Sequence, residues 1–200
     1  MADIKRIGYG QVEPNHLSGI VTGQIYAQLP AATVSGSGNN TTVTPIAQLE
    51  QGQFAKYDYA KGVVDFDGEG EFMLVYNEEK HYDERLWNHK DFVYKATDFT
   101  DGKLYPRLIR TYIGDIFTTN MIGVANTGDS KTEVTIGADD EVVKGAYLAP
   151  NASTGILTVK SSKPGTGMVW QIVKVYTMPD KQAGFKLQRI QWQGGKIKWH

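Results

Sequence analysis

Four acidic residues alternate along one stretch in the middle of the chain: Asp65, Asp67, Glu69 and Glu71. Side chains at alternate positions of an extended chain share one face, so the four carboxylates could together bind a hard cation such as Ca²⁺. Their spacing does not match the twelve-residue calcium loop, however, and the interleaved glycines are typical of a tight turn whose acids face water. The pattern favours a solvated acidic turn, with a calcium site or a glycosidase carboxylate pair as the alternatives.

Other residue types that carry chemistry are scattered. The histidines are His16, His81, His89 and His200. The middle two are eight residues apart and have no third ligand at a matching spacing, so a zinc site is not indicated. The chain has no cysteine, and it contains no Gly-x-Ser-x-Gly elbow, phosphate loop or dinucleotide fingerprint. We expect a protein that is not an enzyme, with no catalytic residue, no bound metal and no cofactor.

Composition sets further limits. The 200 residues are 40% hydrophobic, which is enough apolar material for a real core. A net charge of −1 lacks the positive excess that phosphate binding needs, so nucleic acid is not an expected partner. The N-terminus lacks the pattern of an export signal, and no apolar run approaches the roughly 20 residues of a membrane span. We expect synthesis in the cytoplasm of the producing cell and no association with a membrane.

The elements that would position any site are predicted to be strands. The clearest is a hairpin over residues 167–192, whose first strand is apolar on both faces and is therefore typical of a sheet interior. A proline, an aspartate and a glycine between residues 178 and 184 predict the reversal. A β-bulge near Gln188 and Arg189 would bring the apolar residues of the return strand to one side. These residues are Phe185, Leu187, Ile190 and Trp192.

Short strands are also predicted along the rest of the chain. Residues 20–29 have the β-branched content of a strand, residues 45–75 look like a meander with glycine turns, and residues 105–113 are extended. At most a helical turn or two is expected between residues 77 and 94. Almost no helical period occurs elsewhere. The predicted class is therefore all-β, an antiparallel barrel or sandwich with long surface loops.

The predicted organisation is an extended N-terminal arm, residues 1–19, followed by a β-barrel-like body, residues 20–200. Two polar stretches leave the body as loop excursions. The first, residues 33–44, is small and polar and is expected to be a mobile loop. The second, residues 123–144, has a single apolar alternation at 134–136 around which a small hairpin is allowed.

Two groups of residues are candidates for contact with a partner. The arm carries scattered apolar side chains that cannot form a core of their own and would gain burial only against a partner. They are Ile4, Ile7, Tyr9 and Val12. The middle of the chain is rich in aromatic and basic residues, a composition found in interfaces as well as in cores, and exposed rings there would also suit a sugar platform. The candidates there are Tyr82, Arg85 and Trp87.

Four stretches of the chain share an overall pattern with a known family. They are residues 48–59, 70–78, 114–120 and 169–180. In this pattern, which spans residues 45–192, the chain resembles small structural head proteins of tailed bacteriophages that infect Gram-positive hosts. Such proteins are usually encoded beside the major capsid protein and act as capsid decoration or minor head components.

The resemblance implies a non-enzymatic structural protein of the virion, made in the host cytoplasm, that binds the major capsid protein. We also expect self-association on the capsid, with the N-terminal arm reaching over a neighbouring subunit. A second hypothesis is a carbohydrate- or receptor-binding module displayed on the virion, using the aromatic cluster or the excursion at 123–144. A third is a hydrolase that acts through the four alternating acids.

Overall fold

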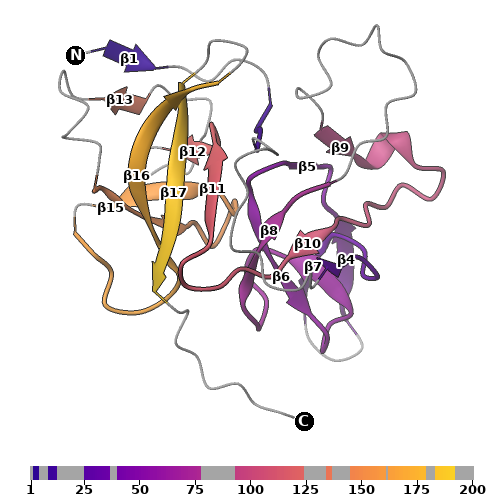
Figure 1. Ribbon diagram of the computed structural model, residues 1–200. Coiled ribbons are helices and arrows are strands. Elements are labelled where there is room, and N and C mark those ends of the chain that lie inside the picture. Colours follow the sequence, from indigo (N-terminus) through magenta and orange to yellow (C-terminus); the bar gives the residue numbers. More distant parts are fainter. Residues whose placement is uncertain are drawn as a thin grey trace, which may run out of the picture.

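The protein is built from β-strands (Figure 1). The computed structural model describes residues 2–4, 9–12, 25–36, 40–77, 93–123, 134–136, 145–160, 162–178 and 183–191. Within these ranges the one helical element is the short 3₁₀ turn η2 (Ala96–Asp98), and no helix has the length and apolarity to cross a bilayer. The prediction of an all-β fold is confirmed.

Two sheets form the body and lie side by side in Figure 1. The first has five antiparallel strands in the order β2 (Ile25–Tyr26), β10 (Leu108–Ile109), β8 (Phe72–Val75), β6 (Phe54–Asp58) and β7 (Val63–Asp65). The second has six strands in the order β11 (Ile116–Thr119), β17 (Ala183–Gln191), β16 (Val169–Thr177), β14 (Tyr147–Pro150), β15 (Leu157–Lys160) and β12 (Ile122–Gly123). Its pairs are antiparallel except β12 with β15, which is parallel.

Three two-stranded sheets accompany the body. They are β1 (Ala2–Ile4) with β13 (Val134–Ile136), β3 (Ala32–Ser35) with β4 (Thr42–Pro45), and β5 (Gln48–Glu50) with β9 (Val93–Lys95). The stretch 33–44, expected to be a mobile loop, thus contributes to two paired strands, because its threonines and valines suit a β-ribbon. In the excursion 123–144, where a small hairpin was allowed, the apolar alternation forms β13, and this strand pairs with the N-terminal β1. Residues 78–92, most of the stretch where a helical turn was expected, lie outside the described ranges.

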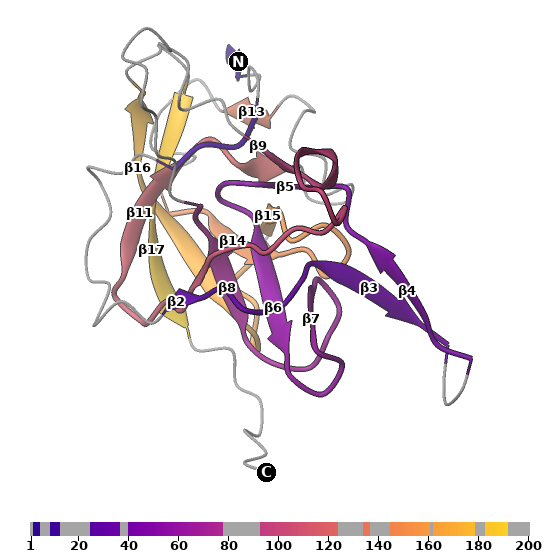
Figure 2. The same cartoon turned by 90° about the vertical axis from the view of Figure 1, so that its right-hand side faces the viewer.

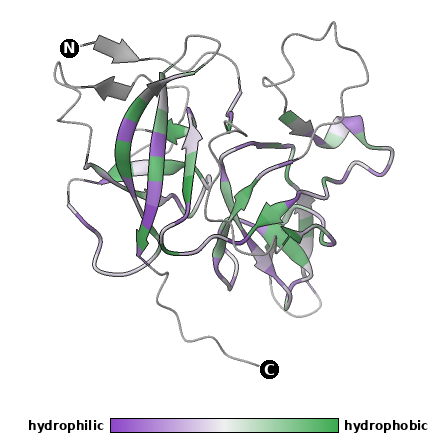
Figure 3. Ribbon diagram, in the orientation of Figure 1, coloured by the Kyte–Doolittle hydropathy of each residue, from purple (hydrophilic) through white to green (hydrophobic). Residues whose placement is uncertain are grey.

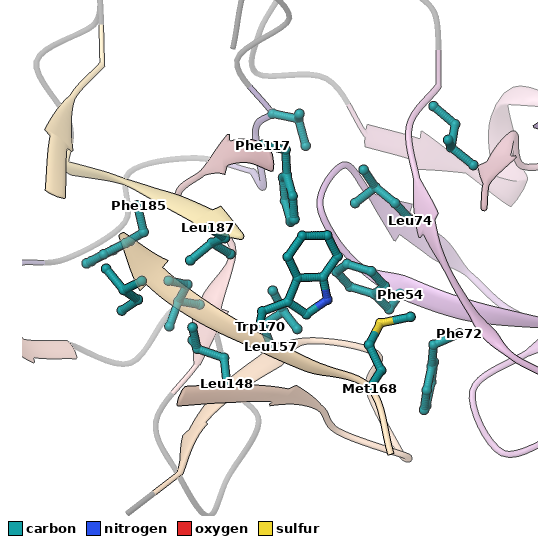
Figure 4. Packing of buried hydrophobic residues seen from close by; sticks show 14 residues of the cluster. Phe54, Phe72, Leu74, Phe117, Leu148, Leu157, Met168, Trp170, Phe185 and Leu187 are labelled. Atoms are coloured by element: carbon teal, nitrogen blue, oxygen red, sulfur yellow. The ribbon is translucent and has the colours of Figure 1, made fainter. Parts of the chain in front are cut away.

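The main core fills the space between the two large sheets (Figure 4). Trp170 of β16 lies at its centre, with its ring centroid 4.8 Å from that of Phe117 and 5.7 Å from that of Phe54. Edge-on and tilted ring pairs at these distances are favourable beyond the apolar area that they bury. The buried members are Val12, Phe54, Phe72, Leu74, Ile109, Phe117, Ile122, Leu148, Leu157, Met168, Trp170, Ile172, Phe185 and Leu187.

A second core covers the opposite face of the five-stranded sheet. Strand β8 shows why both faces are apolar: Phe72 and Leu74 enter the main core, whereas Met73 and Val75 enter the second one. Strands β8 and β10 are accordingly hydrophobic along their length, whereas β16 and β17 mix hydrophobic and hydrophilic residues (Figure 3). Burial on both faces fixes the register of the sheet, because a shift by one residue would exchange the two sets of side chains.

Strands β16 and β17 form the predicted hairpin, with two irregularities in their register. The one in β17 falls at Ile190, just beyond the predicted bulge near residues 188–189. The bulge was expected to bring the apolar residues of β17 to one side, and this prediction is wrong. Phe185 and Leu187 are followed on the inner face by Arg189, while Ile190 is only half-buried. Trp192 lies outside the described residues.

The fully buried Arg189 joins the two sheets. Its Nη2 donates to Glu71 Oε1 at 2.7 Å, and its Nη1 donates to Thr111 Oγ1 at 3.0 Å and to the Thr111 carbonyl oxygen. Glu71 directly precedes β8 and Thr111 follows β10 by two residues, so both acceptors flank strands of the five-stranded sheet, whereas Arg189 lies on β17 of the six-stranded sheet. The other oxygen of Glu71 accepts from Arg110 Nε at 3.1 Å. A cation taken out of water is thus matched by a carboxylate and by neutral acceptors, as its burial requires.

The chain passes from β10 to β11, and thus from one sheet to the other, at residues 110–115. The Gly114 N–H donates to the Arg189 carbonyl at 2.8 Å, and the Arg189 N–H donates to the Asp115 carbonyl at 3.0 Å. The Asp115 carboxylate accepts the Tyr112 N–H at 2.8 Å. Burial raises the pKa of this carboxyl above its usual value, while the Tyr112 N–H and the Arg189 charge act in the opposite direction.

Candidate partner-binding site

Residues 9–12, one of the two described parts of the predicted arm, lie against the body. Val12 forms an antiparallel bridge with Thr119 on the free edge of β11, so the segment covers one edge of the six-stranded sheet. The Val12 side chain is only 7% exposed and belongs to the main core. The expectation that Val12 gains burial only against another protein is therefore wrong for this residue, since its own body buries it.

Hydrogen bonds from the body hold the backbone of this segment. The Gly10 N–H donates to Glu50 Oε2 at 2.7 Å, and the Gln11 N–H donates to Asn120 Oδ1 at 2.7 Å. In return, Thr119 Oγ1 donates to the Gln11 carbonyl at 2.5 Å, and Asn120 Nδ2 donates to the Tyr9 carbonyl at 3.5 Å. We call Glu50, Thr119 and Asn120, together with Met121, the seat of the N-terminal segment.

The seat is held in place by both parts of the body. Glu50 ends β5, and its N–H donates to Gln53 Oε1 at 2.6 Å, while Gln53 Nε2 donates to the carbonyl of Thr154 in the β14–β15 turn at 2.9 Å. Thr119 ends β11, and its Oγ1 accepts the Met121 N–H at 2.9 Å. All of the seat side chains are buried, so their polar atoms depend on protein partners and not on water.

Gly10 allows the close approach of the segment. A Cβ atom at this position would collide with the Gln51 carbonyl oxygen and would lie 2.9 Å from Met121 Sδ. Only glycine fits there without a shift of the seat. Beside it, the half-buried Tyr9 ring has the Lys95 ammonium 5.7 Å from its centroid, an arrangement that favours the cation electrostatically.

This geometry can recognise an extended peptide but shows no group arranged for catalysis. The seat binds the backbone N–H and C=O groups of the segment, as when a strand is added to a sheet edge. It selects for sequence at two positions only: one that must lack a side chain, and one two residues later that carries a small apolar side chain. Within the described residues, no cluster of three or more acidic or histidine side chains could hold a metal ion.

The other predicted contact residues are less well located. The backbone of Ile4 pairs with that of Val134 in the β1–β13 ribbon. Ile7, Tyr82, Arg85 and Trp87 lie outside the described residues, so their assignment to a partner surface stays a prediction.

The four alternating acids do not share a solvated face. Asp65 is buried, accepts the Gly68 N–H at 2.5 Å and lies 3.6 Å from Lys61 Nζ. Asp67 and Glu69 are exposed, as expected for a turn, whereas Glu71 forms the ion pairs with the two arginines described above. The alternation fails because a turn separates β7 from β8, and the chain is not extended between them.

An exposed aromatic ring, of the kind that we associated with sugar binding, occurs in the aromatic-rich middle of the chain. Tyr59 follows β6, is 71% exposed and meets the Tyr57 ring edge-on with a centroid distance of 4.9 Å. The Tyr57 ring in turn lies 5.4 Å from that of Tyr26. Partial burial raises the pKa of the Tyr59 hydroxyl, and the two neighbouring tyrosines add to this effect.

The sequence analysis missed Glu50, Thr119, Asn120 and Arg189. A signal existed for Arg189, because it continues the inward phase of Phe185 and Leu187 and therefore had to be a buried cation or mark a bulge. Glu50 and Asn120 gave no such signal, because their partner is a backbone segment more than 35 residues away in sequence.

Comparison with known proteins leaves the function to be argued from the structure. No family model, no curated protein and no solved structure matches the chain. The resemblance to phage head proteins therefore rests on the sequence pattern of residues 45–192.

Proposed function

We propose that this chain is a structural protein of a virion, a capsid decoration or minor head protein that binds the lattice of the major capsid protein. The observation that carries the proposal is the β3–β4 ribbon, which projects from the body beside the five-stranded sheet (Figure 2). The stretches that resemble phage head proteins support it, because they coincide with β6, β8, β11 and β16 of the body and with β5 of the β5–β9 sheet.

The ribbon has a fixed base and an exposed end. At the base, the Ala31 N–H donates to the Leu104 carbonyl at 2.7 Å, and the Ile46 N–H donates to the Ala31 carbonyl at 3.0 Å. From there, β4 is exposed along its whole length, and Val43 is 56% exposed. A β-branched side chain held on a paired strand loses little conformational freedom on binding, so it suits contact with a neighbouring protein.

The ribbon is tested by placing a charge at its apolar position. We expect Val43→Asp to lower the affinity for shells of the major capsid protein of the proposed virion by at least about tenfold, because burying an unpaired carboxylate costs about 1.4 kcal/mol or more. Co-sedimentation of the purified protein with the shells measures the bound fraction.

Ile113 provides a matched control, since it is also β-branched and is 58% exposed, but it lies between β10 and β11. Ile113→Asp should bind the shells like the unaltered protein. Equal binding by both variants would show that the ribbon is not part of the contact with the shell. If the unaltered protein does not bind the shells, the proposed function is wrong.

A second candidate function is carbohydrate binding on the virion surface, favoured by the exposed ring of Tyr59. The turn that carries this ring is fixed, because the buried Asp58 accepts the N–H groups of Ala60 and Lys61 at 3.0 and 3.1 Å. A glycan array decides this candidate: binding that is lost in Tyr59→Ala, but kept when the exposed Tyr105 is changed to alanine, would support it. An array without signal counts against it.

A further inference from the structure

The seat raises the question of which copy of the chain supplies its occupant. Its hydrogen bonds are made to the backbone of residues 9–11, so they are the same whether the segment comes from the same chain or from another. We propose that the seat also accepts residues 9–12 of a second copy, so that neighbouring copies are linked by exchanged N-terminal segments. The inference deepens the proposed self-association, although the exchange itself needs no capsid.

The occupant is identified by the shape of the seat. The backbone at position 10 lies against the Gln51 carbonyl and Met121, which leaves no room for a Cβ atom. Two residues later, a side chain of the size of Val12 fills a place in the main core. The seat therefore selects a Gly-x-Val segment, and residues 10–12 of this chain supply that sequence.

The length of the connection permits exchange. Residues 13–24 separate Val12 from β2, and a fully extended connection of this length reaches about 40 Å. The radius of gyration expected for a compact chain of this size is only about 16 Å. A segment that leaves its own seat can therefore reach the seat of an adjacent copy.

An empty seat is unfavourable, which is why exchange is preferred to release. Without the segment, the Glu50 carboxylate loses the hydrogen bond from the Gly10 N–H and the Asn120 side chain loses that from the Gln11 N–H, and each lost bond disfavours the empty seat. Val12 would also leave a cavity in the main core. Where copies are held side by side, the high effective concentration of neighbouring segments shifts the balance toward exchange.

A disulfide trap can detect the exchange, because the chain has no cysteine of its own. Val12 and Thr119 face each other in an antiparallel bridge, and this places their Cα atoms within the range that a disulfide spans. Full-length V12C and T119C proteins are mixed at high concentration, incubated and oxidised, and covalent dimers are separated on a non-reducing gel. We expect about tenfold more V12C–T119C dimer than in a mixture of V12C with I113C.

Two further proteins complete the test. The double variant V12C/T119C, oxidised when dilute, should close within one chain, and adding Gly10→Val to V12C should abolish the mixed dimer. If T119C does not fold, sedimentation of the full-length protein at high concentration replaces the trap, and exchange predicts dimers that the variant Gly10→Val does not form. Exchange is overturned if the double variant closes within one chain but the mixed dimer is no more abundant than in the I113C control. If the double variant does not close, the position of the segment in the seat is overturned. Neither result depends on binding to shells, so the two proposals can fail separately.

Discussion

At the scale of single residues, the most unusual feature is the buried cation that joins the sheets. Arg189 has a carboxylate partner in Glu71, and Glu71 is shared with Arg110. A buried ion pair contributes little net stability compared with an apolar pair, but loss of one partner leaves the other charge in a place without water. Glu71 is thus needed mainly because Arg189 is there.

This argument separates Glu71 from its neighbour Glu69. We expect Glu71→Gln to lower the free energy of unfolding by about 3 kcal/mol, because the Arg189 charge is then uncompensated. Glu69 is exposed, so Glu69→Gln should stay within about 0.5 kcal/mol of the unaltered protein. Urea denaturation measures both, and similar values for the two variants would show that the ion pair does not hold the sheets together.

Asp115 should give the protein a recognisable pH dependence. Its pKa is raised in the folded state above the ordinary 3.8, so the folded protein holds this proton more tightly than the unfolded chain. The contribution of Asp115 to stability is therefore most favourable at low pH and decreases as the pH rises through the folded pKa. The side chain of the variant Asp115→Asn does not titrate, so this pH-dependent contribution to stability is absent from it.

The two proteins should accordingly diverge with pH. We expect the free energy of unfolding of Asp115→Asn to increase relative to that of the unaltered protein between about pH 3 and about pH 6. Urea titrations at both pH values give the comparison. A difference that is constant, or that changes in the opposite direction, would show that burial does not control this carboxyl.

At the scale of elements, the turn between β14 and β15 connects the two sheets. The Phe54 N–H on β6 donates to the Gly155 carbonyl at 2.7 Å, and the Gly155 N–H donates to the Asn151 carbonyl at 2.8 Å. Gly155 has a φ of +69°, and a Cβ atom there would collide with the Phe54 carbonyl oxygen and lie 2.8 Å from the Phe66 ring. The turn can approach β6 only because this residue is glycine.

Gly62 offers a matched comparison, since its φ is +67° but nothing lies within 4 Å of the Cβ position. Both Gly→Ala substitutions incur the same conformational cost, of about 1 kcal/mol. We expect Gly155→Ala to lower the melting temperature further, equivalent to about 2 kcal/mol of additional destabilisation from overpacking. If calorimetry finds equal melting temperatures for the two variants, the close approach of the turn to β6 does not require glycine at position 155.

Elements were predictable where local pattern decides them. The β16–β17 hairpin and the strands between residues 45 and 75 follow from alternation and turn residues, which act within a few positions. The β3–β4 ribbon was missed because its polar sequence indicates a loop, and the pairing across the two strands that orders it is not visible in composition. The seat was missed for a different reason, because it joins backbone and side chains from three distant parts of the chain.

At the scale of the whole molecule, the chain consists of two sheets that share one core, with a terminal segment bound at an edge of one sheet and a ribbon that projects beside the other. The class of fold could be predicted because many short strands and little helical period leave few alternatives. The way the two sheets meet could not, since it depends on one buried arginine, one glycine turn and one aromatic cluster. These contacts link the two sheets and leave the β3–β4 ribbon exposed.

The central claim is that this chain binds a capsid lattice, and images of the shells test it most directly. Shells of the major capsid protein of the proposed virion are imaged by electron microscopy with and without the purified protein, and the two averaged maps are subtracted. The proposed function predicts difference density of the size of this chain at regularly repeated positions on the shell. A difference map without such density, obtained with folded protein in excess over capsid subunits, would contradict it.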